Sequence, residues 1–149
     1  MLDRDAIDIV RTVEETARRL RAVDETAAAL KPAPDSWSIK EILGHLIDSA
    51  VNNHQRVVRA QQGPLAFPGY DQNHWVRVQG YQERAWSELT ELWVMCNRHF
   101  AEVIRRVPDQ ALDTACQIGT DRVVTLAWLI EDYSRHMRHH LEEIEQRLP

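Results

Sequence analysis

The chain is poor in the residues that mark several classes of protein. It has only two cysteines, Cys96 and Cys116, without Cys-x-x-Cys spacing, so it indicates neither a disulfide framework nor a zinc–thiolate site. Glycine and proline are scarce, with five and six residues among 149, and the aliphatic and aromatic content is that of an ordinary globular protein. No apolar run approaches the length of a membrane span. We therefore expect a protein without a membrane partner.

The chain also has no large excess of charge of one sign. The 23 acidic and 18 basic residues give a net charge of −5, spread along the chain without a basic run or a basic patch with aromatics. This pattern argues against a nucleic-acid partner. The first residues lack the basic-then-apolar pattern of a signal peptide, which favours a soluble, cytoplasmic protein. A chain of 149 residues fits a single domain, 1–149, that can bury a real core.

Apolar residues recur at steps of three and four through four segments, which predicts four amphipathic helices. The first helix runs from Leu2 until the sequence 31–34, Lys-Pro-Ala-Pro, stops it. The second begins at Ser38, the third covers 86–107 before Pro108, and the last is 125–148. Cys96 lies on the core face of the third helix, where a packed thiol is the expected state. No segment has the period of a strand, so we predict an all-α four-helix bundle.

Polar residues mark where two of these helices begin. Ser38 and Glu41 form an S-x-x-E capping box, in which each side chain can satisfy a free backbone amide. For the last helix, either Asp121 or Thr125 can serve as the cap. The start of the second helix is therefore the better defined of the two.

A connection of about twenty residues, 61–82, joins the second and third helices and is interrupted by glycines and prolines. It permits a crossover, so that these two helices can run parallel. Its segment 70–75, Tyr-Asp-Gln-Asn-His-Trp, is rich in metal-compatible and hydrogen-bonding groups, and Asp71 is a candidate catalytic residue. In the alternative interpretation, Trp75 closes the end of the bundle while Asp71 and Asn73 form turns. A contribution of His74, or of the rest of 63–81, to a site stays open.

Two histidines of the last helix carry the main functional signal. His136 and His140 are four residues apart, so their imidazoles project from one helix face and can share a divalent cation. Two ligands do not make a selective site, and His45 is the best candidate for a third. His45 lies about 140° from the centre of its helix's apolar stripe, which argues against a core histidine. The metal site requires that polar face to line a groove against another helix; the alternative is a solvated surface with scattered histidines.

The residues 37–46, Trp-Ser-Ile-Lys-Glu-Ile-Leu-Gly-His-Leu, combined with His136-x-x-x-His140-Leu141, resemble the DinB-like superfamily. The resemblance covers nearly the whole chain: an opening helix, the W-S-x-x-E-x-x-x-H-L signature, a long crossover and a closing helix with H-x-x-x-H. It implies an up-down-down-up bundle with the crossover between the second and third helices. It also implies a divalent metal, zinc or nickel, held by three histidines, here His45, His136 and His140.

The same resemblance implies a small-molecule substrate and a homodimer, and some relatives use a low-molecular-weight thiol as cosubstrate. No thiol-binding motif is recognisable in this chain, and His139 is an extra histidine beside the pair. Three imidazoles leave a coordination position open, which is typical of catalytic metal sites that lower the pKa of water or a thiol. Glu41 and Asp48 flank His45 and are candidates for orienting it or transferring protons. Asp132 precedes His136 by four positions and could orient it, but an ordinary surface carboxylate is the favoured interpretation.

Two classes of function follow from the sequence. The first is a metal-dependent enzyme, hydrolase-like or transferring a thiol to a small electrophile. The second is a non-catalytic metal-binding or stress-response bundle, dimeric and with structural histidines. A di-iron carboxylate bundle is excluded, because it needs paired E-x-x-H motifs and the sequence has none.

Overall fold

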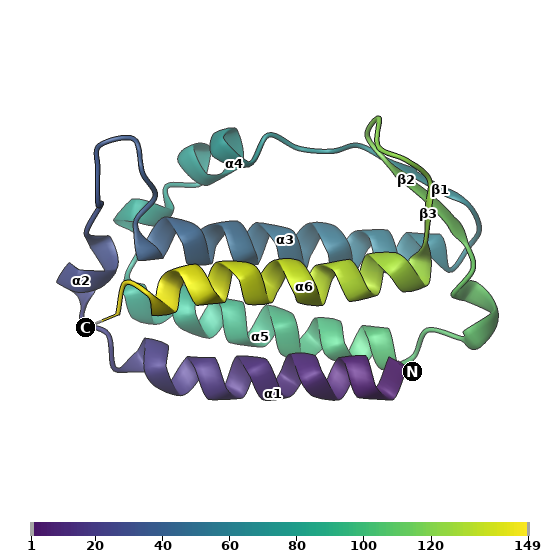
Figure 1. The fold of residues 1–149 in the computed structure, drawn as a ribbon, viewed down its shortest axis with the longest axis horizontal. Helices are drawn as coiled ribbons and strands as arrows, with labels where there is room; N and C mark the ends of the chain where they lie inside the picture. Colours follow the sequence, from purple (N-terminus) through teal and green to yellow (C-terminus); the bar gives the residue numbers. More distant parts are fainter. Residues whose placement is uncertain (1, 149) are drawn as a thin grey trace.

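Four long helices lie side by side along one axis in the computed structural model, which describes residues 2–148 (Figure 1). They are α1 (Leu2–Arg21), α3 (Ile39–Ala60), α5 (Trp86–Arg105) and α6 (Leu126–Glu145). Helices α1 and α6 run in one direction and α3 and α5 in the other. The order is up-down-down-up, as predicted. After α3 the connection runs back along the bundle, so that α5 starts at the same end as α3 and runs parallel to it.

The ends of the helices confirm one predicted cap and correct another boundary. Ser38 and Glu41 form the capping box of α3, and Thr125 rather than Asp121 caps α6. The first helix does not continue toward the prolines as expected. It ends at Arg21, and a separate short helix α2 (Glu25–Ala29) follows. Asp24 causes this break, since its side chain accepts a hydrogen bond from the amide of Ala27 and caps α2 instead of continuing α1.

A small sheet joins the two long connections, where we had predicted no strand. It contains β1 (Leu65–Phe67), β2 (Ala115–Ile118) and β3 (Val124–Thr125) in the order β1-β2-β3. β1 pairs in parallel with β2, placing Leu65 opposite Cys116, and β2 pairs antiparallel with β3. The sheet lies over the end of the bundle where α3 ends and α6 begins (Figure 1). It therefore ties the crossover to the segment that leads into α6.

Three further short helices complete the connections: α4 (Gln72–Val78), η1 (Tyr81–Glu83) and η2 (Asp109–Ala111). α4 and η1 belong to the crossover and contact α3. At one of these contacts Tyr81 lies against Gly44, so closely that a Cβ atom on Gly44 would come within 2.2 Å of the Tyr81 ring. The absence of a side chain at Gly44 thus allows the crossover to close on α3.

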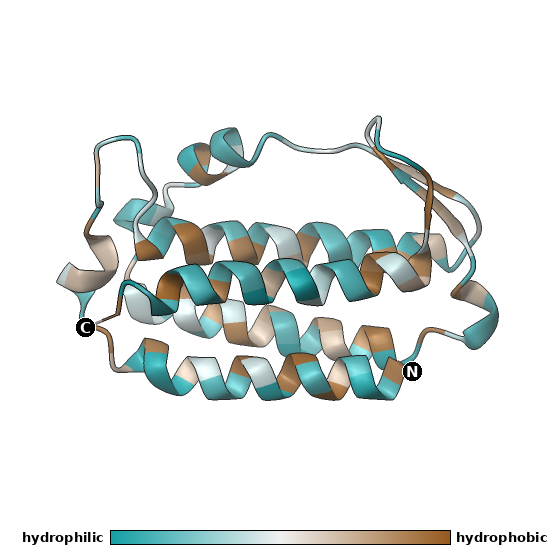
Figure 2. Ribbon diagram, in the orientation of Figure 1, coloured by the Kyte–Doolittle hydropathy of each residue, from teal (hydrophilic) through white to brown (hydrophobic). Residues whose placement is uncertain are grey.

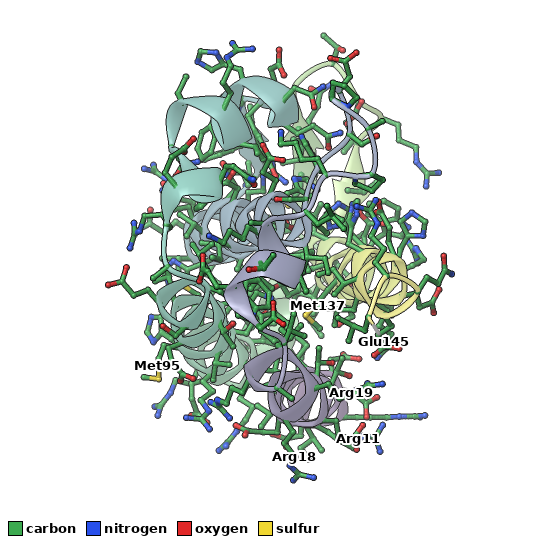
Figure 3. The ribbon with its side chains drawn as sticks, turned by 90° about the vertical axis from the view of Figure 1, so that its left-hand side faces the viewer. Arg11, Arg18, Arg19, Met95, Met137 and Glu145 are labelled. Carbon is green, nitrogen blue, oxygen red and sulfur yellow. The ribbon has the colours of Figure 1, made fainter. Side chains whose placement is uncertain are left out.

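The four long helices enclose an apolar core, with apolar and polar residues alternating along each ribbon (Figure 2). Seen along the bundle axis, Met137 lies among the helices, whereas Arg11 and Arg18 project outward from α1 (Figure 3). Cys116 is buried and Cys96 half-buried, and burial raises the pKa of both thiols. A packed thiol is therefore the state of Cys96, as the sequence predicted.

Helix α3 occupies the centre of the fold and is buried on nearly all sides in its first half. Residues 39–50 are all buried. Helices α5 and α6 cover one side of α3, while α4, η1 and β1 of the crossover contact it elsewhere. The polar face of α3 is therefore enclosed within the protein.

Within residues 2–148, no helix combines the length and apolarity that crossing a membrane would require.

Candidate metal centre

The structure brings together three histidines from two helices. The Nε2 atoms of His45 on α3 and His136 on α6 lie 3.2 Å apart, although 91 positions separate them in the sequence. The ring of His140 lies 4.7 Å, centroid to centroid, from each of the other two rings. One ring nitrogen from each histidine falls within 4.8 Å of the others. The three imidazoles therefore meet where α6 packs on the polar face of α3.

His45 is more buried than its sequence position indicated. Only 2% of its surface is exposed, so the expectation that it would not be buried in the protein is wrong. The apolar stripe of α3 does point away from it, but the helix is covered on a second side, where the indole of Trp37 packs at 5.1 Å from the imidazole. Its Nδ1 atom has no hydrogen-bond partner among the described residues.

Neighbouring side chains hold the other two imidazoles. The Nδ1 atom of His140 lies 3.2 Å from Oε2 of Glu143, one turn farther along α6, and this carboxylate is itself bound by Arg147 at 2.7 Å. The Nδ1 atom of His136 lies 3.4 Å from Oγ of Ser49 on α3. A proton on Nδ1 of His140, donated to Glu143, leaves Nε2 as a bare lone pair, which is the form that binds a metal.

Burial keeps two of the imidazoles neutral. Desolvation, followed by the nearby His136 and His140, lowers the pKa of His45 from 6.5 to about 3. Desolvation and His140 lower the pKa of His136 to about 4, against a smaller upward effect of Asp132. At neutral pH each of these two rings is therefore uncharged, with one nitrogen lone pair available to a cation.

The predicted catalytic carboxylates bind other groups, although Glu41 and Asp48 flank His45 in the sequence. Glu41 accepts the backbone amide of Ser38 and pairs with Lys31 at 2.9 Å. Asp71 is exposed and caps α4 by accepting the amide of His74. Asp71 is thus a helix cap, where the alternative interpretation had it in a turn.

Asp48 is buried and faces the crossover. One of its oxygens accepts hydrogen bonds from the Tyr81 hydroxyl at 2.6 Å and from Gln79 at 2.7 Å. Burial raises the pKa of Asp48, while these two donors oppose the shift. Across residues 2–148, no hydrogen bond joins Glu41, Asp48 or Asp71 to the three histidines, and their catalytic roles stay predictions.

The remaining histidines lie apart from the three-histidine cluster or at its edge. His139 is exposed and its ring lies 5.2 Å from that of His140. His74 is exposed on α4 beside Arg77. His54 and His99 form a separate pair with ring centroids 5.1 Å apart. Within residues 2–148, no third histidine, cysteine or carboxylate joins this pair at ligand distance, so it lacks the third ligand that a selective site needs.

A pocket of about 400 Å³ opens beside the cluster. His136 belongs to both: its side chain lines the pocket, and its Nε2 atom contacts His45. The pocket lies between α3 and α6 and is bounded at one end by residues of β2, β3 and the turn that joins them. A small molecule in this pocket would contact the face of the histidine cluster formed by His136.

Comparison with known proteins places the chain in a family. A family model described as the DinB superfamily matches residues 8–144. The chain belongs to the DinB superfamily. A relative from Halalkalibacterium halodurans, provisionally named a metal-dependent hydrolase, is 21% identical over 129 residues, which cover 85% of this chain and 74% of the relative.

Two solved structures share the fold. YfiT from Bacillus subtilis, titled a probable metal-dependent hydrolase with an unusual four-helix bundle topology, aligns with a TM-score of 0.85 at 18% identity. The alignment covers 97% of this chain and 85% of YfiT. A mycothiol-dependent maleylpyruvate isomerase aligns with a TM-score of 0.76 at 13% identity, and this DinB chain spans 60% of that larger protein. At these identities the likeness shows the fold alone.

Two contacts of this DinB chain were not found by sequence reasoning. Glu143 follows His140 by three positions, a spacing that places both side chains on one helix face. Ser49 follows His45 by four positions and reaches His136 across the interface. The first contact had a signal in the sequence, the H-x-x-E spacing, whereas the second depends on how α6 packs on α3.

Proposed function

We propose that this protein is a metal-dependent enzyme in which His45, His136 and His140 hold a divalent cation, zinc or nickel, and act on a small molecule. The observation that carries the proposal is the double position of His136, in the histidine cluster and in the wall of the pocket. A purely structural metal site is closed by protein ligands, whereas a catalytic one keeps a position open toward substrate.

The histidines fit such an ion. Zinc binds imidazole nitrogen at about 2.0–2.1 Å in tetrahedral geometry, which separates two ligand nitrogens by about 3.4 Å. The Nε2 atoms of His45 and His136 are 3.2 Å apart. Two neutral imidazole nitrogens facing each other at this distance gain at most one hydrogen bond, whereas a cation satisfies both lone pairs. The low pKa of the buried His45 and of the half-buried His136 keeps both rings neutral, which supports the same assignment.

A divalent ion held here would supply Lewis acidity and lower the pKa of a bound water or thiol. The chain's own residues would fix the geometry. Glu143 holds His140 in one tautomer, Ser49 contacts His136, and Trp37 covers the buried ring of His45. In the pocket, the buried side chains of Leu129 and Tyr133 on α6 line the wall together with His136.

Two reaction classes follow for this site: hydrolysis of a small molecule, and transfer of a low-molecular-weight thiol to a small electrophile. Hydrolysis agrees with the names of the H. halodurans relative and of YfiT. Thiol transfer agrees with the mycothiol-dependent isomerase, whose fold is similar. A catalytic role of Glu41, Asp48 or Asp71 stays a prediction, and so does the homodimer.

Metal content of protein purified without an affinity tag tests the site. We expect close to one zinc or nickel per chain by plasma mass spectrometry in the wild type, and a loss of at least tenfold in His45→Ala and His136→Ala. The control is His139→Ala, which removes an exposed histidine from the same helix and should leave the metal in place. Equal metal content in all four proteins would refute the three-histidine site.

Activity separates an enzyme from a binding protein. The metal-loaded protein is incubated with 4-nitrophenyl acetate, and separately with 1-chloro-2,4-dinitrobenzene in the presence and absence of cysteine. Release of nitrophenolate faster than in buffer without protein supports hydrolysis. Release of chloride that requires both the protein and the thiol supports thiol transfer. Either activity should vanish in His136→Ala. A fully metallated protein without either activity would favour the non-catalytic alternative.

A further inference from the structure

Arg56 lies in the wall of the pocket and is buried without an anionic partner. Only 8% of its surface is exposed. Its nearest hydrogen-bond partner is Oδ1 of Asn53, at a marginal 3.5 Å, and its Nε atom has no partner among the described residues. The guanidinium lies over the ring of Phe67 in β1, 5.6 Å from the ring centroid. One face of the guanidinium thus stacks on an aromatic ring, while most of its N–H groups have no hydrogen-bond acceptor among the described residues.

An unpaired charge in this position is costly, because burial removes the water that would otherwise solvate it. Burial lowers the pKa of Arg56, but a guanidinium stays protonated in proteins, so the positive charge persists. The charge of Asp121, in the turn between β2 and β3, raises the pKa of Arg56. Among the described residues, however, no ion pair within 4 Å joins Arg56 to Asp121 or to another carboxylate. Asp132, also in the pocket wall, is paired with Arg135 at 2.5 Å.

The other walls of the pocket suit a flat or apolar group. Tyr70 comes from the crossover, and Trp128 and Tyr133 come from α6. The Tyr133 hydroxyl donates to Asn97, so the ring presents its face and edge rather than a free hydroxyl. Burial raises the pKa of Tyr70, which keeps its phenol neutral beside the guanidinium. The pocket therefore combines the buried cation of Arg56 with aromatic side chains. Its lining also includes Asp132 and, at the exposed β2–β3 turn, Asp121 and Arg122.

Arg56 and the histidine cluster stand at different points along the same face of α3. Ser49, Asn53 and Arg56 follow one another at steps of four and three, and all three line the pocket. Seven residues of helix separate Ser49 from Arg56, or about 10 Å along the axis. Ser49 contacts His136, so a molecule that fills the pocket would reach Arg56 with one part and His136 with another.

We propose that the pocket binds small carboxylates, with the acid group held by Arg56 in a two-pronged hydrogen bond and a flat apolar part against Tyr133 and Trp128. The planar guanidinium matches a carboxylate in this way. The position of the substrate's reacting end, near His136, rests on the proposed metal-dependent function. The carboxylate subsite itself does not depend on a metal.

Benzoate is the probe, and benzamide is its neutral counterpart of the same shape. Binding of both is measured by NMR titration to the metal-loaded wild type and to wild type treated with EDTA, because a bound metal could itself attract a carboxylate. The variants are Arg56→Gln and, as matched control, Arg59→Gln. Arg59 lies on the same helix over the same Phe67 ring, 5.9 Å from its centroid, but it is exposed and outside the pocket wall.

We expect wild type, with or without metal, to bind benzoate at least tenfold more tightly than benzamide. Arg56→Gln should weaken benzoate at least tenfold, in line with hydrogen bonds to charged groups, and Arg59→Gln should change it less than twofold. Benzoate should also shift the Nε–H resonance of Arg56 in the wild type, a readout that survives if Arg56→Gln fails to fold. Equal binding of benzoate and benzamide, or equal effects of the two substitutions, would overturn the proposal.

The metal centre and the carboxylate subsite can fail separately. If the wild type holds no metal but benzoate binding still depends on Arg56, the subsite stands and the proposed function falls. If the protein holds its metal but benzoate binding is indifferent to Arg56, the function stands and the subsite falls.

Discussion

Glu143 lies one helical turn beyond His140, with its Oε2 atom 3.2 Å from Nδ1 of the imidazole. The other oxygen of the carboxylate is held by Arg147, which also donates to the backbone carbonyl of Trp37 at 2.6 Å. The indole of Trp37 in turn packs on His45. One chain of contacts therefore links the orientation of two of the three histidines.

Replacing Glu143 should weaken metal binding without removing a ligand. In Glu143→Gln we expect the zinc affinity to fall about tenfold, because carboxylates that orient metal-bound histidines typically contribute 10- to 100-fold. Competition with a fluorescent zinc chelator measures the change. Glu142→Gln, an exposed neighbour on α6, is the control and should bind as the wild type does. An unchanged affinity in Glu143→Gln would contradict the orienting role.

The metal-free protein should lose stability as the pH falls below about 6.5. The pKa of His45 is about 3 in the folded protein and near 6.5 in the unfolded chain. Between these values the unfolded chain binds one more proton at this site, so the free energy of unfolding falls by about 1.4 kcal/mol per pH unit at most. Above pH 6.5 neither state is protonated there, and this dependence disappears.

Urea denaturation in EDTA, from pH 7.5 to pH 5, measures this effect. The comparison is with His45→Leu, which has no titrating group at position 45. The stability of the wild type should decline more steeply with falling pH than that of the variant. Parallel declines would show that His45 is accessible to protons in the folded state.

Gly44 should be sensitive to a single added methyl group. A Cβ atom there would lie 2.2 Å from the ring of Tyr81, which is buried and held by Asp48. Overpacking of this kind costs about 1–3 kcal/mol, which outweighs the gain of about 1 kcal/mol in helix propensity. We expect Gly44→Ala to lower the free energy of unfolding.

The control for this substitution is Gly69→Ala. A Cβ atom at Gly69 would meet nothing within 4 Å, so its effect on urea denaturation should stay within about 0.5 kcal/mol. A Gly44→Ala protein as stable as Gly69→Ala would mean that the crossover is not closed on α3.

Removal of the metal should lower the melting temperature but keep the helices. The core is apolar and does not depend on the three histidines. A ligand present at 100 times its dissociation constant stabilises the folded state by about 2.7 kcal/mol, or about 5–10 °C for a domain of this size. Circular dichroism should show the same helical spectrum at 20 °C with zinc and with EDTA. Loss of the helical spectrum in EDTA would contradict an apolar core that stands alone.

The bundle could be predicted from the sequence because its signals are local. Apolar spacing gives the helices, and the capping box of Ser38 and Glu41 marks where α3 begins. The convergence of His45 with His136 was a hypothesis that the family resemblance supported, although the angular position of His45 pointed away from the core. What buries His45 is the packing of Trp37 and α6 on a second side of α3, and no pattern within α3 indicates this.

The strands could not be predicted, because none is longer than four residues and two of them pair across about fifty positions. Arg56 was hidden for a similar reason. In the sequence it is one of two arginines near the end of α3, and only the positions of β1 and the β2–β3 turn distinguish the buried Arg56 from the exposed Arg59. Long-range pairing thus determines the part of the site that would contact substrate.

Anomalous diffraction at the zinc edge, from crystals grown with one equivalent of zinc, tests the central claim most directly. We predict one strong peak between α3 and α6, at about 2.0–2.1 Å from a ring nitrogen of each of His45, His136 and His140, with a coordination position open toward the pocket. A peak at the separate pair of His54 and His99, or at surface carboxylates with the three-histidine cluster empty, would contradict the account.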